Sequence, residues 1–362
     1  MKKLPIQSKN FIYEAVKYLA ALSAALLLGV LIIKLQGQDV AAAGKAVLFG
    51  AFGNISRLGN TIRWVTPCLM TGIAAAVSFR SGIWNMGIGG QLYMGAFAAT
   101  AVALYIPLPQ TVAPIVCLIA AGAAGMAFAL IPALLKRFLG VSELITTLML
   151  NYIATLLTTY FTKLVNGISA NNNSKAMATP LIDDRYRLTT LIPKTNASTG
   201  IFIAIFFVVL MYLVYKYTIM GYEMRQVGSN IRFARAGGVR TNRMYLMIFL
   251  LSGFIAGLAG GIEILGVYGK FTANFASNIG WDGIMIATIA ANSPIATGFV
   301  GILWGALKSG SLYMEALTET NRLTVEVIQA AFVLFVTIDY RGFINRLREN
   351  RNRNAAKTVK GA

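Results

Sequence analysis

Long apolar runs are the feature that most constrains the fold of this chain. Residues 19–33, 201–213 and 323–338 hold almost no charge. They are long enough, or nearly so, to cross a hydrocarbon core, which takes roughly 20 helical residues and about 17 at the short end. Only 12% of the 362 residues are charged, against roughly 25% in a soluble domain. No stretch of soluble-domain length remains between the apolar runs, so the sequence predicts a polytopic membrane protein.

Ten apolar ranges are candidates for membrane-spanning helices. The N-terminus is basic and then apolar, without a short apolar region followed by a small-residue cleavage site, so we interpret it as a retained first span. We expect an all-α bundle of about ten transmembrane helices with broken or re-entrant segments. The predicted spans are residues 16–35, 59–79, 88–106, 112–135, 142–165, 200–217, 244–267, 281–292, 298–314 and 322–340.

Residues that commonly carry enzyme chemistry are scarce. The chain has no histidine, which removes the usual general base and the commonest zinc ligand. Its Gly-Lys pairs at 44–45 and 269–270 lack the first glycine of a P-loop and the Ser or Thr that follows the lysine. We therefore expect neither catalysis nor a cofactor in this chain, and any ATP must be handled elsewhere.

Basic residues give the chain a net charge of +19. With the N-terminus inside, most of the 32 lysines and arginines fall on inner segments, as the positive-inside rule requires, so both termini are predicted to be cytoplasmic. These residues are scattered over several loops beside spans, which favours contact with anionic membrane lipid and no nucleic-acid binding. Glu263 and Asp282 are expected near the outer boundary, paired with Lys270 or with lipid head groups.

Two segments interrupt the regular pattern of spans. Residues 82–95, GIWNMGIGGQLYMG, hold five glycines together with Asn85 and Gln91. Glycine-broken helices often mark transport pathways, although glycine also allows close packing between helices. Residues 281–314 are short for two crossings and turn at 292–298 without a charge. The helices there are either short and shielded by neighbours or re-entrant.

A polar stripe follows the predicted span 142–165. Glu143, Thr147, Asn151 and Thr155 recur every four residues, which places them on one helix face. Threonine can bond back to its own helix or hold helices together, whereas an amide near mid-span is costly to leave unpaired. We expect the stripe to face a solute. The residues predicted to line the pathway are Asn85, Gln91, Thr147, Asn151 and Thr155.

A cationic island separates two apolar ranges. It reads GYEMRQVGSNIRFARAGGVRTNR over residues 221–243, with five arginines and one glutamate. Asn230 is a suitable N-cap, residues 231–236 suffice for one or two helical turns, and Gly237 or Gly238 can supply a left-handed C-cap. So short a helix needs a surface to lie on. The alternative is a topogenic arginine cluster on anionic lipid.

Four motifs stand in order along the chain. They are SFRSGIWNMGIGGQLYMGAFAA (78–99), GVSELITTLMLNYIA (140–154), YEMRQVGSNIRFARAGGV (222–239) and LSGFIAGLAGGIEILGVYGKF (251–271). Together they resemble the permease subunits of bacterial ABC importers of the ribose, galactose and nucleoside group, in particular the longer of the two nucleoside permeases. The likeness covers most of residues 60–340. Gly89 stands where that family often has a glutamate, so no substrate role is carried over from that acidic position.

The resemblance implies a pathway between this chain and a second, different and shorter permease. It further implies ATPase subunits that bind ATP and Mg²⁺, an extracytoplasmic solute-binding lipoprotein, and a place in the bacterial cytoplasmic membrane. Nucleosides are the implied cargo, with simple sugars next. Residues 218–243 would be the cytoplasmic coupling loop that engages the ATPase. The residues predicted to couple this chain to the ATPase are Glu223, Arg225, Gly228, Asn230, Arg232, Ala234, Arg235 and Gly238.

The remaining segments complete the predicted organisation. We expect one permease domain over residues 1–340 and a basic cytoplasmic tail over 341–362. Residues 166–198 form an external loop long enough to dock a partner. Glycines four apart, at 253, 257 and 261, predict that the span 244–267 packs centrally in the bundle.

Two other classes of protein have comparable apolar bundles. An ion-coupled secondary transporter also has broken helices, but it usually needs an internal carboxylate or cation site. A membrane-embedded enzyme needs convergent Asp, Glu or His, and the 13 acidic residues here are scattered. The ion-coupled transporter is the alternative that we retain.

Overall fold

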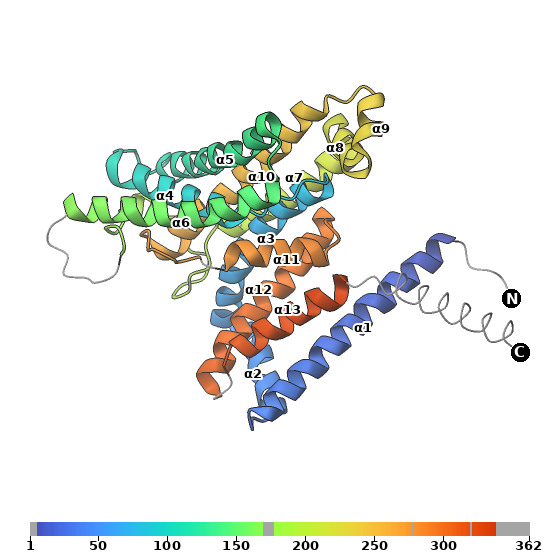
Figure 1. Ribbon diagram of the computed structural model, residues 1–362. Coiled ribbons are helices and arrows are strands. Elements are labelled where there is room, and N and C mark those ends of the chain that lie inside the picture. Colours follow the sequence, from blue (N-terminus) through green and yellow to red (C-terminus); the bar gives the residue numbers. More distant parts are fainter. Residues whose placement is uncertain (1–5, 169–176, 277, 319–320, 338–362) are drawn as a thin grey trace, which may run out of the picture. The chain divides into compact units, whose positions relative to one another are not determined.

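The computed structural model describes residues 6–168, 177–276, 278–318 and 321–337 (Figure 1). The chain divides into two compact units. One joins residues 1–37 with residues 323–362, and the other is residues 38–322. The basic tail predicted over 341–362 lies outside the described residues, and one permease domain over residues 1–340 stays a prediction.

Helices dominate the described residues, which confirms the all-α prediction. Outside helices, the described residues form two isolated β-bridges. Within the described ranges, seven helices are long and apolar enough to cross a membrane, and an eighth candidate arises if Ser23–Leu35 and Val40–Phe52 are counted as one broken span. Each of the ten predicted ranges holds a helix. The seven are α3 (Ile55–Arg80), α4 (Ile88–Tyr105), α5 (Ala113–Leu139), α6 (Glu143–Ile168), α7 (Gly200–Tyr217), α10 (Thr241–Glu263) and α12 (Pro294–Leu317).

The smaller unit pairs α1 (Ile6–Leu35) with α13 (Leu323–Thr337). The two helices approach closely at Gly29, where an added Cβ would overlap the side chain of Ile328. At the end of α1 the side-chain amide of Gln36 donates a hydrogen bond to the Thr324 hydroxyl at 3.4 Å. These contacts join the start of the chain to the last helix that the structure describes.

The larger unit is built around two mostly buried helices, α3 and α10. α3 packs against α7, α10, α11 and α12, and α10 also packs against α4 and α5. Glycine permits the close approach, because a Cβ added at Gly257 of α10 would lie 2.9 Å from the Cα of Gly125 on α5. Figure 1 shows α4 and α5 running beside α10, and α6 packs against α4 and α5. The central position predicted for this span is therefore confirmed.

The larger unit also holds shorter helices. α2 (Val40–Phe52) and α8 (Ile219–Ser229) fall outside the predicted spans, because both are too short to register as long apolar runs. α11 (Ile279–Ile289) has 11 residues, about 16 Å of helix, against a hydrocarbon core of roughly 30 Å. It ends in a turn in which Ala291 and Asn292 have φ values of 47° and 58°. The abnormal segment predicted over 281–314 is thus a short helix followed by a full-length one.

The described part of the loop predicted over 166–198 lies against the end of α10. There α10 continues into a π-helical turn, η2 (Ile264–Tyr268). Backbone N–H groups of residues 179, 182 and 188 donate to carbonyls of residues 271, 269 and 265 at 2.8–2.9 Å. The hydroxyl of Tyr186 donates to the Ile106 carbonyl between α4 and α5 at 2.6 Å. The loop is therefore anchored at the ends of these helices.

Candidate functional site

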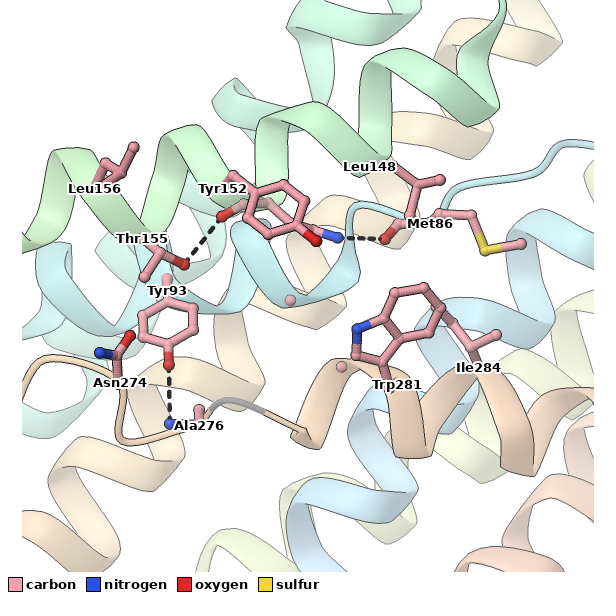
Figure 2. Close-up of a pocket in the computed structure, with 13 residues that line it drawn as sticks. Met86, Tyr93, Leu148, Tyr152, Thr155, Leu156, Asn274, Ala276, Trp281 and Ile284 are labelled. Carbon is pink, nitrogen blue, oxygen red and sulfur yellow. Dashed lines mark hydrogen bonds between the residues drawn. The ribbon is translucent and has the colours of Figure 1, made fainter. Parts of the chain in front are cut away.

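A cavity of about 360 Å³ opens between α6, the start of α4 and the start of α11. Figure 2 shows the side chains that surround it. None of its lining residues is charged. The lining residues are Met86, Gly89, Tyr93, Leu148, Asn151, Tyr152, Thr155, Leu156, Asn274, Ala276, Gly280, Trp281 and Ile284.

Asn151 and Thr155 of the predicted stripe belong to this cavity wall. The Asn151 side chain accepts a hydrogen bond from the Gly90 N–H at 2.7 Å. It donates one to the Met86 carbonyl at 2.8 Å, which is drawn as a dashed line in Figure 2. Thr155 bonds back to the carbonyl of Asn151 at 3.0 Å. Asn151 therefore fixes residues 81–91, the broken segment, to α6. An amide carries two N–H donors, and among the described residues only one of those of Asn151 has a partner.

Thr147 does not line the cavity. It is fully buried, its hydroxyl donates to the Glu143 carbonyl at 2.6 Å, and it accepts a bond from the Met86 N–H at 3.2 Å. Leu148 lines the cavity in its place. A stripe of residues four apart drifts around an α-helix, by about 80° over eight residues. The drift moves the start of the stripe into the protein interior.

Asn85 and Gln91 are fully buried and lie outside the cavity lining. Their side-chain amides bond to each other reciprocally, with both N···O distances 3.0 Å. Asn85 also donates to the Ser252 hydroxyl of α10 at 2.9 Å and accepts a bond from the Gly87 N–H at 3.0 Å. These bonds fold residues 85–91 onto themselves and tie them to α10. A direct role of the two amides toward solute stays a prediction.

α9 (Ile231–Ala236) has the local structure that the sequence predicts. The side chain of its N-cap, Asn230, accepts hydrogen bonds from the N–H groups of residues 232 and 233 at 3.0 and 3.1 Å. Gly238 adopts the left-handed conformation with a φ of 85°. Ala234 is buried, whereas Ile231 and Phe233 are 49% and 65% exposed. The outer face of α9 is therefore apolar as well as basic.

The other residues predicted to couple this chain to the ATPase lie around this helix. Arg232 and Arg235 are exposed on α9, and Arg225 is half-buried on α8. Glu223 of α8 and Gly238 line one hollow of about 370 Å³ together with two arginines, 240 and 243. The eight residues thus gather over α8, α9 and the start of α10.

Gly228 connects α8 to the broken segment. A Cβ added at Gly228 would overlap the carbonyl oxygen of Arg80 and would lie 2.9 Å from the Cα of Ser81. Gly82 has a φ of 73°, and a Cβ added there would lie 3.2 Å from the Cα of Gly228. The hydroxyl groups of Ser81 and Tyr215 lie 3.3 Å apart and share a hydrogen bond. The backbone of α8 therefore rests directly on the stretch that leads to Asn85 and the cavity.

One buried and one partly buried ion pair are found elsewhere among the described residues of the larger unit. Arg63 of α3 pairs with Glu263 of α10 at 3.0 Å, with side chains 8% and 1% exposed. Asp282 of α11 pairs with Lys308 of α12. The expectation that both acids pair with Lys270 or lipid head groups is wrong, because each has a cation inside the bundle. A lysine or arginine within a predicted span is the signal that identifies such partners.

Comparison with known proteins identifies the family of this chain. Residues 57–337 match the permease component of branched-chain amino acid transport systems. The chain belongs to this family. It is 32% identical over 328 residues to the guanosine ABC transporter permease NupP of Bacillus subtilis, covering 89% of this chain and 92% of NupP. Such a match makes this chain a permease subunit of an ABC transporter.

Two further relatives differ in the cargo for which they are named. The glucose ABC transporter permease TsgB13 of Haloferax volcanii is 32% identical over 331 residues, covering 88% of this chain and 85% of TsgB13. The nucleoside permease NupB of Lactococcus lactis is 28% identical over 326 residues, covering 87% of this chain and 88% of NupB. A second Bacillus subtilis permease, NupQ, is 24% identical over 292 residues, covering 78% of this chain and 91% of NupQ. None of these relatives is named as an ion-coupled transporter.

Most of the cavity lining was not predicted from the sequence, including two aromatic residues at its rim. Tyr152 lies one position beyond Asn151 on the cavity-facing side of α6, and Trp281 lies in the first turn of α11. A pattern of residues 148, 151, 152, 155 and 156, spaced by three or four, would have identified the α6 face. The contribution of α11 depends on packing of distant segments, which no local pattern reports.

Proposed function

We propose that this chain is one of two permease subunits of an ABC importer that moves nucleosides across the bacterial cytoplasmic membrane, with simple sugars as the next cargo class. Its pathway passes through the cavity between α4, α6 and α11. A separate ATPase, which binds ATP and Mg²⁺, engages α8 and α9 on the cytoplasmic side. A solute-binding lipoprotein delivers cargo from the other side, and both termini are cytoplasmic.

The observation that carries the choice of cargo is the uncharged lining of the cavity. A free amino acid has an ammonium and a carboxylate, and each is costly to remove from water without a charged or strongly hydrogen-bonding partner. The cavity offers amide, hydroxyl and aromatic groups instead. Such groups suit neutral solutes that carry hydroxyls. The names of NupP, NupB and TsgB13 agree with this choice.

The exposed rim of the cavity supports a second permease subunit. Tyr152 and Leu156 of α6 are 68% and 70% exposed, although both line the cavity. A polar solute needs walls on all sides to cross the hydrocarbon core, so another surface must close this rim. NupP and NupQ are both from Bacillus subtilis, and the alignment lengths and coverages make NupQ the shorter of the two. A different and shorter permease is therefore the proposed partner.

The contact between Gly228 and Gly82 supports the proposed coupling. The exposed isoleucine, phenylalanine and arginines of α9 present an apolar and basic surface to the ATPase. Movement of α9 is passed to α8, which rests on the backbone of residues 80–82. Those residues lead to Asn85 and to Met86, whose carbonyl is bonded to Asn151 in the cavity wall. Closure of the ATPase pair would thereby change the width of the pathway.

Reconstitution tests the proposed function. Liposomes holding this chain, the second permease and the ATPase should take up radiolabelled guanosine when the binding protein is outside and ATP is on the ATPase side. They should not take up radiolabelled leucine. Uptake driven by a sodium or proton gradient in liposomes without the ATPase would establish an ion-coupled transporter instead, and ATP-driven uptake of leucine would refute the proposed cargo.

A further inference from the structure

Two aromatic rings at the cavity rim have no partner ring among the described residues. Tyr152 extends from α6 and Trp281 from α11, and Figure 2 shows both rings bordering the same open space. They are 68% and 45% exposed. Tyr93, also in the lining, is by contrast packed edge-on against the rings of Phe271 and Phe275. The faces of Tyr152 and Trp281 are therefore available to something outside this chain.

Their polar tips are also available. Among the described residues neither the Tyr152 hydroxyl nor the Trp281 indole N–H has a hydrogen-bond partner. Trp304, in the neighbouring helix α12, donates its indole N–H to Asp282 at 3.1 Å, and Tyr93 accepts a bond from the Ala276 N–H at 3.1 Å. Tyrosine and tryptophan usually find a polar partner when they are covered. A ligand in the cavity would cover both rings and supply that partner.

The position of the indole favours a solute over lipid. Figure 2 shows the Trp281 ring nitrogen directed toward the side of the cavity where Tyr93 and Asn274 lie. Asn274 is exposed, and it is held with a φ of 61° in the left-handed region. A donor and an amide on one side of an aromatic space match a solute with a flat face and a polar edge. Lipid acyl chains would satisfy neither group.

We propose that Tyr152 and Trp281 hold the base of a nucleoside by stacking as it passes, with the Trp281 N–H and the Asn274 amide directed at polar atoms of the base or ribose. This inference rests on the proposed function, because it assumes that the cavity is part of the pathway. It adds a reason for selection of nucleosides over simple sugars. Every nucleobase has two flat π faces, so stacking accepts different bases and rejects solutes without one.

Transport kinetics of the whole complex test the proposal. Loss of one stacking ring weakens base binding on the order of tenfold. Trp281→Leu and Tyr152→Leu should therefore raise the KM for guanosine by about tenfold while leaving the maximal rate close to that of the wild type. Trp281→Phe and Tyr152→Phe keep an aromatic ring and should restore most of the affinity. Tyr160→Leu is the matched control, because Tyr160 is an exposed tyrosine of α6 outside the cavity lining.

Photolabelling gives a second readout that does not depend on rates. 8-Azidoguanosine, activated by light during turnover, should label peptides that contain residue 152 or 281, and excess guanosine should protect them. The proposal is wrong if both leucine variants transport guanosine with wild-type KM, or if they lose the second permease on purification while the phenylalanine variants keep it. In the first case ATP-driven guanosine uptake would still stand. Absence of that uptake in the wild-type complex would refute the proposed function itself.

Discussion

α9 with its caps and the broken segment at residues 81–91 lie at the two ends of one proposed mechanical connection, and they are held in different ways. The structure of α9 depends on neighbours in sequence, since Asn230 caps it and Gly238 follows it. The broken segment is held by side chains or backbone of α6, α7, α8 and α10. The first region takes both of its caps from adjacent residues and acts through a partner. The second has its shape only in the folded bundle, so a shift in one element reaches the others.

Gly228→Trp should cause the largest loss of function, because it pushes α8 away from the broken segment. An indole has no room against the backbone of residues 80–82. Solute-stimulated ATP hydrolysis should fall on the order of 100-fold, toward the upper range of coupling effects. The variant should still reach the membrane and bind the solute-binding protein. Gly237→Ala is the control, since an added Cβ there meets nothing closer than 3.5 Å. If Gly228→Trp hydrolyses ATP and transports solute like the wild type, residues 221–243 bind lipid and do not couple the permease to the ATPase.

Asn85→Leu should have the next largest effect, mainly on stability. It leaves the amide of Gln91, the hydroxyl of Ser252 and the N–H of Gly87 without their present partner. Each buried group left unpaired costs about 1–3 kcal/mol, so thermal unfolding in detergent should occur at a clearly lower temperature. The double variant Asn85→Leu with Gln91→Leu should cost less than the sum of the single variants. If the variants transport poorly but are as thermally stable as the wild type, the two amides act as solute ligands and not mainly in folding.

Cysteine labelling tests which face of α6 borders the cavity. Cysteines at positions 148, 151 and 155 should react with an aqueous thiol reagent during turnover, because these positions line the cavity. A cysteine at the fully buried position 147 should react on the order of tenfold more slowly. The native cysteines, 68 and 117, are buried and give little background. Equal labelling at all four positions would show that this cavity is not the aqueous path.

Asn230→Ala should have the smallest effect. Removal of an N-cap costs about 1 kcal/mol, and here the loss is confined to the six residues of α9. Solute-stimulated ATP hydrolysis should drop by about fivefold, and Asn230→Asp should retain it because aspartate caps equally well. A loss as large as that of Gly228→Trp would mean that α9 is not a locally stabilised element.

The sequence alone predicts the parts of this molecule that depend on local or one-dimensional patterns. Long apolar runs place a helix in every predicted span, and the spacing of Asn230 and Gly238 predicts α9 with its caps. Glycines four apart predict the central position of α10. In each case the relevant residues are neighbours in sequence or on one helix.

Features that depend on contacts between distant segments are the ones that the sequence does not predict. Asn85 and Gln91 have the side-chain chemistry of solute ligands, yet their amides bond to each other, and Asn85 also bonds to Ser252, 167 residues further along the chain. Trp281 enters the cavity because α11 packs against α4. Glu263 finds Arg63 across 200 residues. Such pairings are set by the assembled bundle, and no single stretch carries their signal.

In the proposed mechanism, movement of the coupling loop reaches the cavity through Gly228 and residues 81–91. The most direct test is the labelling rate of a cysteine at position 155, measured in the full complex with and without a non-hydrolysable ATP analogue. Nucleotide should change this rate in the wild-type background and in Gly237→Ala, and the change should be lost in Gly228→Ala, where the added Cβ already forces α8 away from Ser81. An undiminished response to nucleotide in Gly228→Ala would contradict the account, because the signal would then reach the cavity by another route.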